Sequence, residues 1–315
     1  MIKGRILKGI AGFYYIHVEG RGTYECKAKG IFRNQKIKPL VGDDVEIEIL
    51  SEEEKTGNLV EIFPRSSELI RPAVANVDQA LVIFAAAKPK PNLSLLDRFL
   101  IMMDRQEVHT VICFNKMDEA SEAELQRLGE IYAGCGSRVL FTCARKNEGV
   151  QELKHLLLGH TTTVAGPSGV GKSTLINRLL GEKRLATDGL RNDDKGHHTT
   201  THRELLVLPN GAMVIDTPGM RELGMWDAAS GVGQTFGDIE ELAARCRFRN
   251  CSHSGEPGCA VRAAIRSGEL DSGRWQSYQK LKNENSYAAD SESYLAAKEK
   301  KFKEISKINK YNKKR

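Results

Sequence analysis

TTTVAGPSGVGKST, residues 161–174, decides the fold of this chain. The first five residues are β-branched or apolar, as in a buried strand, and STLINRLLG, from residue 173, has helical spacing. The residues between fit G-x-x-x-x-G-K-[ST], whose glycines let backbone N–H groups surround phosphate oxygens. Because strand, loop and helix occur together, we interpret the stretch as a nucleoside triphosphate site and not as a chance glycine-rich turn.

The phosphate loop assigns distinct roles to neighbouring side chains. Lys172 is expected to reach the β- and γ-phosphates, and Ser173 is expected to bind Mg²⁺. The start of the helix adds the positive end of its dipole. The predicted phosphate-binding residues are Gly166, Pro167, Ser168, Gly169, Val170, Gly171, Lys172, Ser173 and Thr174, and Lys172 is also a candidate catalytic residue.

A second motif, FNKMDEA at residues 114–120, indicates which base is bound. Its N-K-x-D part follows the apolar run HTVICF, and α/β sheets bind ligands at the carboxyl ends of their strands. A carboxylate at Asp118 can accept from N1–H and the N2 amine of guanine, whereas adenine offers no such pair. The alternative hypothesis of an ATP-dependent kinase therefore leaves Asp118 unexplained. The predicted guanine-binding residues are Asn115, Lys116, Met117 and Asp118, with Cys143 and Ala144 from TCA at the end of the next strand.

Two segments after the phosphate loop are expected to complete the site. Asp216-Thr-Pro-Gly219 fits D-x-x-G, so Asp216 would hold Mg²⁺ through water and the Gly219 amide would contact the γ-phosphate. A threonine among residues 199–201 would also ligate Mg²⁺, and we favour Thr200. The base-reading motif precedes the phosphate loop, which reverses the common GTPase order and predicts a circularly permuted domain.

The residue that orients the attacking water is a separate question. Ras-type GTPases place a Gln directly after D-x-x-G, and Met220 stands at that position here. His198 precedes the threonine run, and histidine titrates near neutral pH, so His198 is our candidate. The alternative is a histidine that faces phosphate or RNA.

The pattern of apolar residues divides the chain into three parts. Residues 1–70 contain short β segments such as FYYIHV and DDVEIEIL, which predict a small antiparallel barrel. FPRSSELIRPAVAN then has the composition of a linker. Apolar runs alternate with helical spacing in residues 71–227, which predicts a parallel α/β sheet. Residues 228–315 are expected to be helical.

The net charge of +6 is concentrated at the end of the chain. Residues 298–315 hold nine Lys or Arg against two Glu, so this basic tail either seeks a polyanion or forms a solvated helix end. No run of residues has the length and apolarity of a membrane span, and the start does not resemble a signal peptide. We therefore expect a cytoplasmic protein without membrane association.

A cluster of metal-ligand types lies near residue 250. Cys246, Cys251, His253 and Cys259 have the spacing C-x₄-C-x-H-x₅-C, with Gly and Pro residues that permit a tight turn. Four such ligands with no open position suit one structural Zn²⁺. The alternative is three core thiols and a surface histidine.

Over essentially its whole length the chain resembles the small ribosomal subunit biogenesis GTPase A family of circularly permuted GTPases. CKAKGIFR and PLVGDDV resemble its N-terminal signature, and GHHTTTHREL resembles its first switch. The resemblance implies an N-terminal OB-fold, a permuted GTPase core and a C-terminal zinc domain. It also implies a monomer that hydrolyses GTP to GDP on the small ribosomal subunit, in late maturation, with nucleotide state controlling binding and release.

The resemblance implies that rRNA is a partner, and aromatic and basic residues are the expected contacts. The rival hypothesis is a nucleotide-switched adaptor for a protein partner. The candidate RNA contacts in the barrel are Tyr14, Tyr15, Lys27, Lys29, Phe32 and Arg33, each of which could instead be a core aromatic or a solvated charge.

Overall fold

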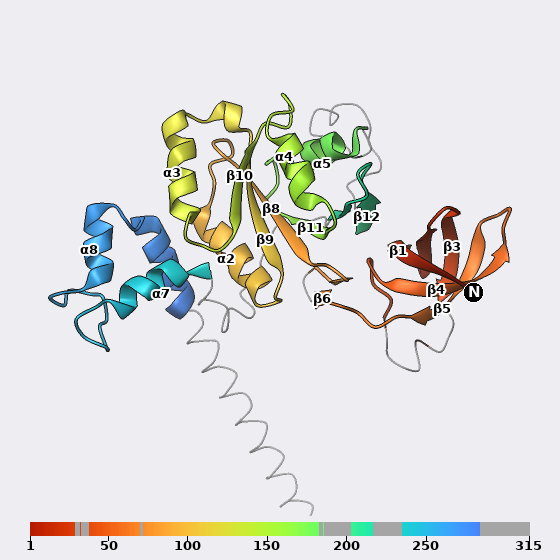
Figure 1. Ribbon diagram of the computed structural model, residues 1–315, viewed down its shortest axis with the longest axis horizontal. Coiled ribbons are helices and arrows are strands. Elements are labelled where there is room, and N and C mark those ends of the chain that lie inside the picture. The colour runs from red at the N-terminus through yellow and green to blue at the C-terminus, as the bar shows by residue number, and fades with distance from the viewer. Residues whose placement is uncertain are drawn as a thin grey trace, which may run out of the picture. The chain divides into compact units, whose positions relative to one another are not determined.

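The computed structural model describes residues 1–28, 32, 38–69, 72–182, 185, 203–216 and 235–283. They form two compact units (Figure 1). The first comprises Met1–Asn92, Gln106–Ala133 and Ser137–Glu222, and the second comprises Leu93–Arg105, Gly134–Gly136 and Leu223–Arg315. No helix within the described ranges is long and apolar enough to cross a membrane. The expectations for Lys29, Arg33, His198, residues 199–201, Gly219, Met220 and the basic tail lie outside these ranges.

The N-terminal strands close into a barrel, as predicted. Pairing runs in the order β1-β2-β3-β5-β4 and returns from β4 to β1. The expectation of a purely antiparallel barrel was wrong at one edge, because β3 and β5 are parallel. β4 is antiparallel to both β1 and β5, so β5 runs in the same direction as β1 and β3. The strands are β1 (Ile2–Ile10), β2 (Phe13–Val18), β3 (Gly22–Ala28), β4 (Asp44–Ser51) and β5 (Thr56–Ile62).

The stretch that we expected to be a linker is held against the barrel. Its short strands β6 (Glu68–Leu69) and β7 (Val74–Ala75) pair with each other. The Asn76 side chain donates to the Gly42 carbonyl at 3.0 Å, and the Ala75 amide donates to the Val41 carbonyl at 2.9 Å. These bonds fix the chain as it leaves the barrel.

The central sheet contains every strand that we expected from the apolar runs. Its order is β10-β9-β8-β11-β13-β12, and all neighbours are parallel except β12 and β13. The expectation of a parallel sheet was therefore wrong at β12, because a tight turn at residues 209–211 reverses the chain. The strands are β8 (Gln79–Ala85), β9 (His109–Asn115), β10 (Arg138–Thr142), β11 (Thr161–Ala165), β12 (Glu204–Val207) and β13 (Met213–Asp216).

Helices lie on both sides of this sheet (Figure 1). On one side α3 (Glu122–Tyr132) starts at a capping box in which Ser121 and Glu124 satisfy each other's backbone amides. On the other side α4 (Val150–Leu157) and α5 (Lys172–Leu180) share one apolar cluster with the sheet. The sequence analysis had not predicted α4.

The second unit is helical around a buried arginine. It contains α2 (Leu93–Asp104), α7 (Gly237–Ala244), α8 (Ala260–Ser267) and a helical stretch at 272–283. Arg274 is 2% exposed and binds Asp238 at 3.0 Å and Asp97 at 3.3 Å. Because Asp97 lies on α2, this network joins a helix from early in the sequence to the C-terminal helices.

Candidate nucleotide site and metal centre

The phosphate loop connects β11 to α5. Gly166 has φ of 140°, and a Cβ atom there would lie 2.1 Å from the Ile83 carbonyl oxygen of β8. Only glycine fits so close to a neighbouring strand. Lys172 begins α5 and folds back over the loop, donating to the carbonyls of Gly166 at 2.9 Å and Pro167 at 2.6 Å. Its ammonium therefore lies at the loop, where phosphate oxygens could replace these carbonyls.

Asn115 joins the base-reading motif to the phosphate loop. Its Nδ2 donates to the Val170 carbonyl at 2.9 Å, and its Oδ1 accepts from the Thr142 hydroxyl and the Ala144 amide, both at 3.1 Å. A Cβ atom on Gly171 would lie 2.5 Å from Asn115 Nδ2. Motifs that lie 55 residues apart in the sequence thus form one hydrogen-bonded site.

The proposed base acceptor sits beside positive charge. A hydrogen bond from the Cys143 thiol lowers the pKa of the Asp118 carboxyl, and the charges of Lys146 and Arg145 lower it further. Lys146 Nζ lies 3.9 Å from Asp118. Asp118 is therefore ionised and available as an acceptor at neutral pH.

Arg178 and Lys116 hold the base-reading loops through hydrogen bonds that the sequence did not predict. Arg178 of α5 donates to the carbonyls of Ala144 at 2.9 Å and Arg145 at 3.1 Å. Lys116, with φ of 60°, donates to the Lys88 carbonyl at 2.9 Å. Arg178 lies on the exposed side of α5, four residues after Thr174, and this position next to the phosphate loop could have indicated its role.

Asp216 ends β13 directly beside the strand that leads into the phosphate loop. Its partner in the register is Val164 of β11, and Asp216 is 8% exposed. Burial raises the pKa of Asp216, Lys172 opposes this, and Glu204 adds to it. A cation next to such a carboxylate would stabilise its ionised form, so Asp216 fits the expected Mg²⁺ role. Ser173 lies in the first turn of α5.

The four predicted metal ligands converge. One ligand atom from each of Cys246, Cys251, His253 and Cys259 lies within 4.8 Å of the others. Nδ1 of His253 lies 3.6 Å from the Cys246 sulfur and 3.5 Å from the Cys259 sulfur, and the two sulfurs are 3.9 Å apart. A tetrahedron with Zn–S bonds of about 2.3 Å has edges of about 3.8 Å, so the donor set fits a tetrahedral metal ion.

Side chains around the cluster fix its loop. Glu256 accepts from the amides of Ser252 at 2.7 Å and Ser254 at 2.9 Å. Hydrogen bonds from the Ser252 hydroxyl and the Gly255 amide hold the pKa of Glu256 well below its usual range. Trp275 contacts the His253 ring edge-on, with centroids 5.5 Å apart. These contacts hold the loop and orient the His253 ring.

The candidate RNA contacts occupy different environments. Phe32 is 5% exposed and belongs to the barrel core, so that expectation was wrong. On the barrel surface the Lys8 ammonium lies 4.7 Å from the Tyr15 ring centre, and the Lys27 ammonium lies 5.0 Å from that of Phe13. These two pairs combine aromatic rings with positive charge, and the sequence analysis had not included Phe13.

The base-reading motif and the phosphate loop form one site on one sheet, although they occur in the reverse of the common order along the chain. This arrangement defines a class of protein, the circularly permuted P-loop GTPases. A family model described as RsgA GTPase matches residues 62–226, and one described as RsgA N-terminal domain matches residues 3–58. The chain belongs to the RsgA family of GTPases, and it is a GTP-hydrolysing enzyme.

Individual relatives and solved structures agree with this assignment. Two relatives named Small ribosomal subunit biogenesis GTPase RsgA come from Agathobacter rectalis and Alkaliphilus metalliredigens. The first is 47% identical over 90% of this chain and 99% of its own, and the second is 45% identical over 89% and 97%. YjeQ from Thermotoga maritima is 32% identical with a TM-score of 0.69, covering 90% of this chain and 98% of its own. YloQ, described as a circularly permuted GTPase, is 34% identical with a TM-score of 0.67, covering 91% and 95%.

Proposed function

We propose that this protein binds the small ribosomal subunit, acts in its late maturation, and uses the bound nucleotide to control binding and release. The observation that supports the nucleotide part is the Asn115 network, which places the base-reading motif against the phosphate loop. The names of the full-length relatives support the ribosomal part. We expect a cytoplasmic monomer that contacts rRNA.

Recognition of GTP is assigned to residues at the ends of neighbouring strands. Asp118 accepts from the guanine N1–H and N2 amine, and the backbone of the loop that begins at Thr142 lies toward O6. Lys172 exchanges its two loop carbonyls for β- and γ-phosphate oxygens. The remaining proposed nucleotide contacts are Asn115, Lys116, Met117, Cys143, residues 166–171, Ser173, Thr174 and Gly219.

Hydrolysis is assigned to residues around the γ-phosphate. Ser173, Asp216 and Thr200 would hold Mg²⁺, which neutralises charge on the phosphates when it is bound with GTP. His198 would orient the attacking water. The Gly219 amide would contact the γ-phosphate and lose that contact after hydrolysis, which is a state-dependent interaction of the kind that nucleotide control requires.

The Cys/His cluster is assigned to one structural Zn²⁺. Three thiolates and one imidazole form a soft donor set with no open position, and this favours zinc over magnesium or calcium. Zinc would hold residues 246–259 in place and take no part in hydrolysis.

The GTPase rate of the full chain, measured with and without purified small ribosomal subunits, tests this proposal. We expect the subunit to raise turnover, and GTP to compete for the site far better than ATP. A rate that small subunits leave unchanged, together with capture of a non-ribosomal protein only in the GTP state, would replace the proposal with the adaptor hypothesis.

A further inference from the structure

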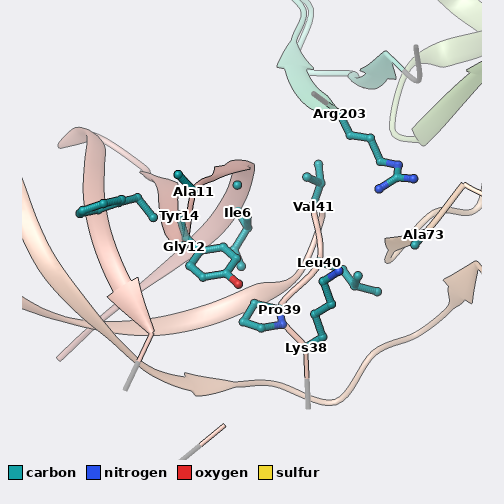
Figure 2. A pocket seen from close by; sticks show the side chains of 12 residues that line it. Ile6, Ala11, Gly12, Tyr14, Lys38, Pro39, Leu40, Val41, Ala73 and Arg203 are labelled. Atoms are coloured by element: carbon teal, nitrogen blue, oxygen red, sulfur yellow. The ribbon is translucent and has the colours of Figure 1, made fainter. Parts of the chain in front are cut away.

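A cavity of about 380 Å³ lies in the first unit, and none of the residues that line it is among those assigned to the nucleotide (Figure 2). Its volume is in the range of sites that hold one small ligand. Apolar residues, the two aromatic residues Phe13 and Tyr14, and two positively charged residues line it. None of the described residues that line it is acidic. The lining residues used below are Ile6, Gly9, Tyr14, Lys38, Leu40 and Arg203.

One wall of the cavity has a fixed shape. The fully buried Asp43 accepts from the Leu40 amide at 2.7 Å and pairs with Arg65 at 2.7 Å. Arg65 also donates to the Lys38 carbonyl at 2.8 Å. The loop that carries Lys38 and Leu40 is therefore held by a buried ion pair before any ligand arrives, which lowers the entropy cost of binding.

Tyr14 of β2 lines the cavity and is half-buried, because part of its ring packs against the barrel core. Tyr14 pairs in register with Gly9, and a Cβ atom on Gly9 would lie 3.3 Å from the Tyr14 ring. The adjacent turn is Ala11-Gly12, which adds no large side chain. Figure 2 shows the Tyr14 hydroxyl directed toward Pro39, while Arg203 enters from the opposite side.

We propose that this cavity binds one nucleotide of single-stranded RNA, with the base stacked on Tyr14 and a backbone phosphate between Lys38 and Arg203. The proposal rests on the proposed function and names the part of the RNA that this face contacts. Stacking on an aromatic ring accepts any base, so the site selects an unpaired nucleotide and not a particular sequence. Two cations with no carboxylate in the lining match the charge of a nucleic-acid backbone.

The position of Arg203 connects the cavity to the GTPase sheet. Arg203 directly precedes β12, whose first residue, Glu204, lies 4.0 Å from the Lys8 ammonium of the barrel. Glu204 also pairs in register with Asp216 of β13. RNA bound at Arg203 would thus lie at the start of β12, which pairs with the strand of the proposed Mg²⁺ ligand Asp216. We expect this binding to change the stimulated rate of hydrolysis.

The test uses the full chain with a non-hydrolysable GTP analogue and a labelled single-stranded oligoribonucleotide of about twelve nucleotides. We expect Tyr14→Leu to weaken binding about five- to hundredfold, as loss of one stacked base predicts, while Tyr14→Phe binds like the parent. Lys38→Gln should reduce the slope of log affinity against log salt by about 0.7. Lys90→Gln, an exposed lysine outside the cavity, is the matched control.

Three outcomes separate the cavity from the wider function. Weaker RNA binding and a lower subunit-stimulated rate in Tyr14→Leu and Lys38→Gln, with the basal rate unchanged, would support the proposal. RNA binding as strong as the parent's in both variants, or an equal loss in Lys90→Gln, would overturn the proposed cavity. The proposed function would still stand if small subunits stimulate the parent protein. A parent protein that neither binds RNA nor responds to small subunits would overturn both. If Tyr14→Leu disturbs the barrel, the exposed Lys38→Gln decides the result.

Discussion

Replacing Asn115 with alanine tests the physical basis of the nucleotide site. Asn115 is 2% exposed, and its side chain makes three hydrogen bonds, to Val170, Thr142 and Ala144. At about 1 kcal/mol for each buried bond, Asn115→Ala should lower the free energy of unfolding by about 3 kcal/mol. If half of this energy positions the loops for nucleotide, the affinity for GTP falls about tenfold.

The assay is urea unfolding followed by circular dichroism, with GTP affinity measured by fluorescence of a labelled nucleotide. Asn210→Ala is the matched control, because Asn210 also makes two side-chain hydrogen bonds but is exposed in the β12–β13 turn. Because the bonds of Asn210 are exposed to solvent, we expect Asn210→Ala to cost less than Asn115→Ala. Thr142→Val, which removes one of the three bonds, should lie between the two.

Equal unfolding free energies for Asn115→Ala and Asn210→Ala would refute the reasoning. So would a variant that is destabilised as expected but binds GTP with parental affinity, because the bonds would then be structural and would not position the loops. An intermediate value for Thr142→Val is needed to show that the energy is divided among the three bonds.

Three other substitutions and one metal measurement test the remaining parts of the site and the core of the second unit. Asp118→Ala should weaken GTP binding by about 2–4 kcal/mol; a variant with the parent's preference for GTP over ATP in competition would contradict the base assignment. Metal analysis should find about one Zn²⁺ per chain, and a metal-free chain with an unchanged circular dichroism spectrum would exclude a structural zinc. Arg274→Met should cost about 3–5 kcal/mol because it removes the charge that compensates Asp97 and Asp238, and urea unfolding with both carboxylates changed to amides should show most of it recovered. His198→Ala should lower turnover with near-normal GTP affinity; an unchanged stimulated rate would remove it from the mechanism.

Local spacing was sufficient to predict most of the sheet and the convergence of the four predicted metal ligands. Strands such as β8 and β9 are continuous apolar runs, because both faces of a parallel sheet are buried. The Cys/His spacing around a Gly–Pro turn predicted convergence, and one ligand atom from each residue does converge. These signals lie within a few residues of each other, where chain geometry limits the possible structures.

Long-range pairings could not be predicted in this way. The bond from Asn115 to Val170 spans 55 residues, and the pair of Arg274 with Asp97 spans 177. Neither partner has a local pattern that identifies the other, because packing of whole elements decides which side chains meet. The antiparallel β12 is different, since Asn210-Gly211 between two apolar runs is a recognised hairpin signal that the sequence analysis did not use.

The order of strands in the sheet explains how a permuted chain keeps one nucleotide site. From β8 the chain adds β9 and β10 on one side of the sheet, and β11 then returns to the other side of β8. Ligands bind at such a point, where the connections from two neighbouring parallel strands go to opposite sides. The phosphate loop comes after β11 and the base-reading motif after β9, so their contact depends on which strands are neighbours and not on which is made first. Permutation therefore changes where the chain leads after Asp216. Among the described residues no further strand of this sheet follows β13, and the chain continues to the predicted metal ligands, the first of which is Cys246.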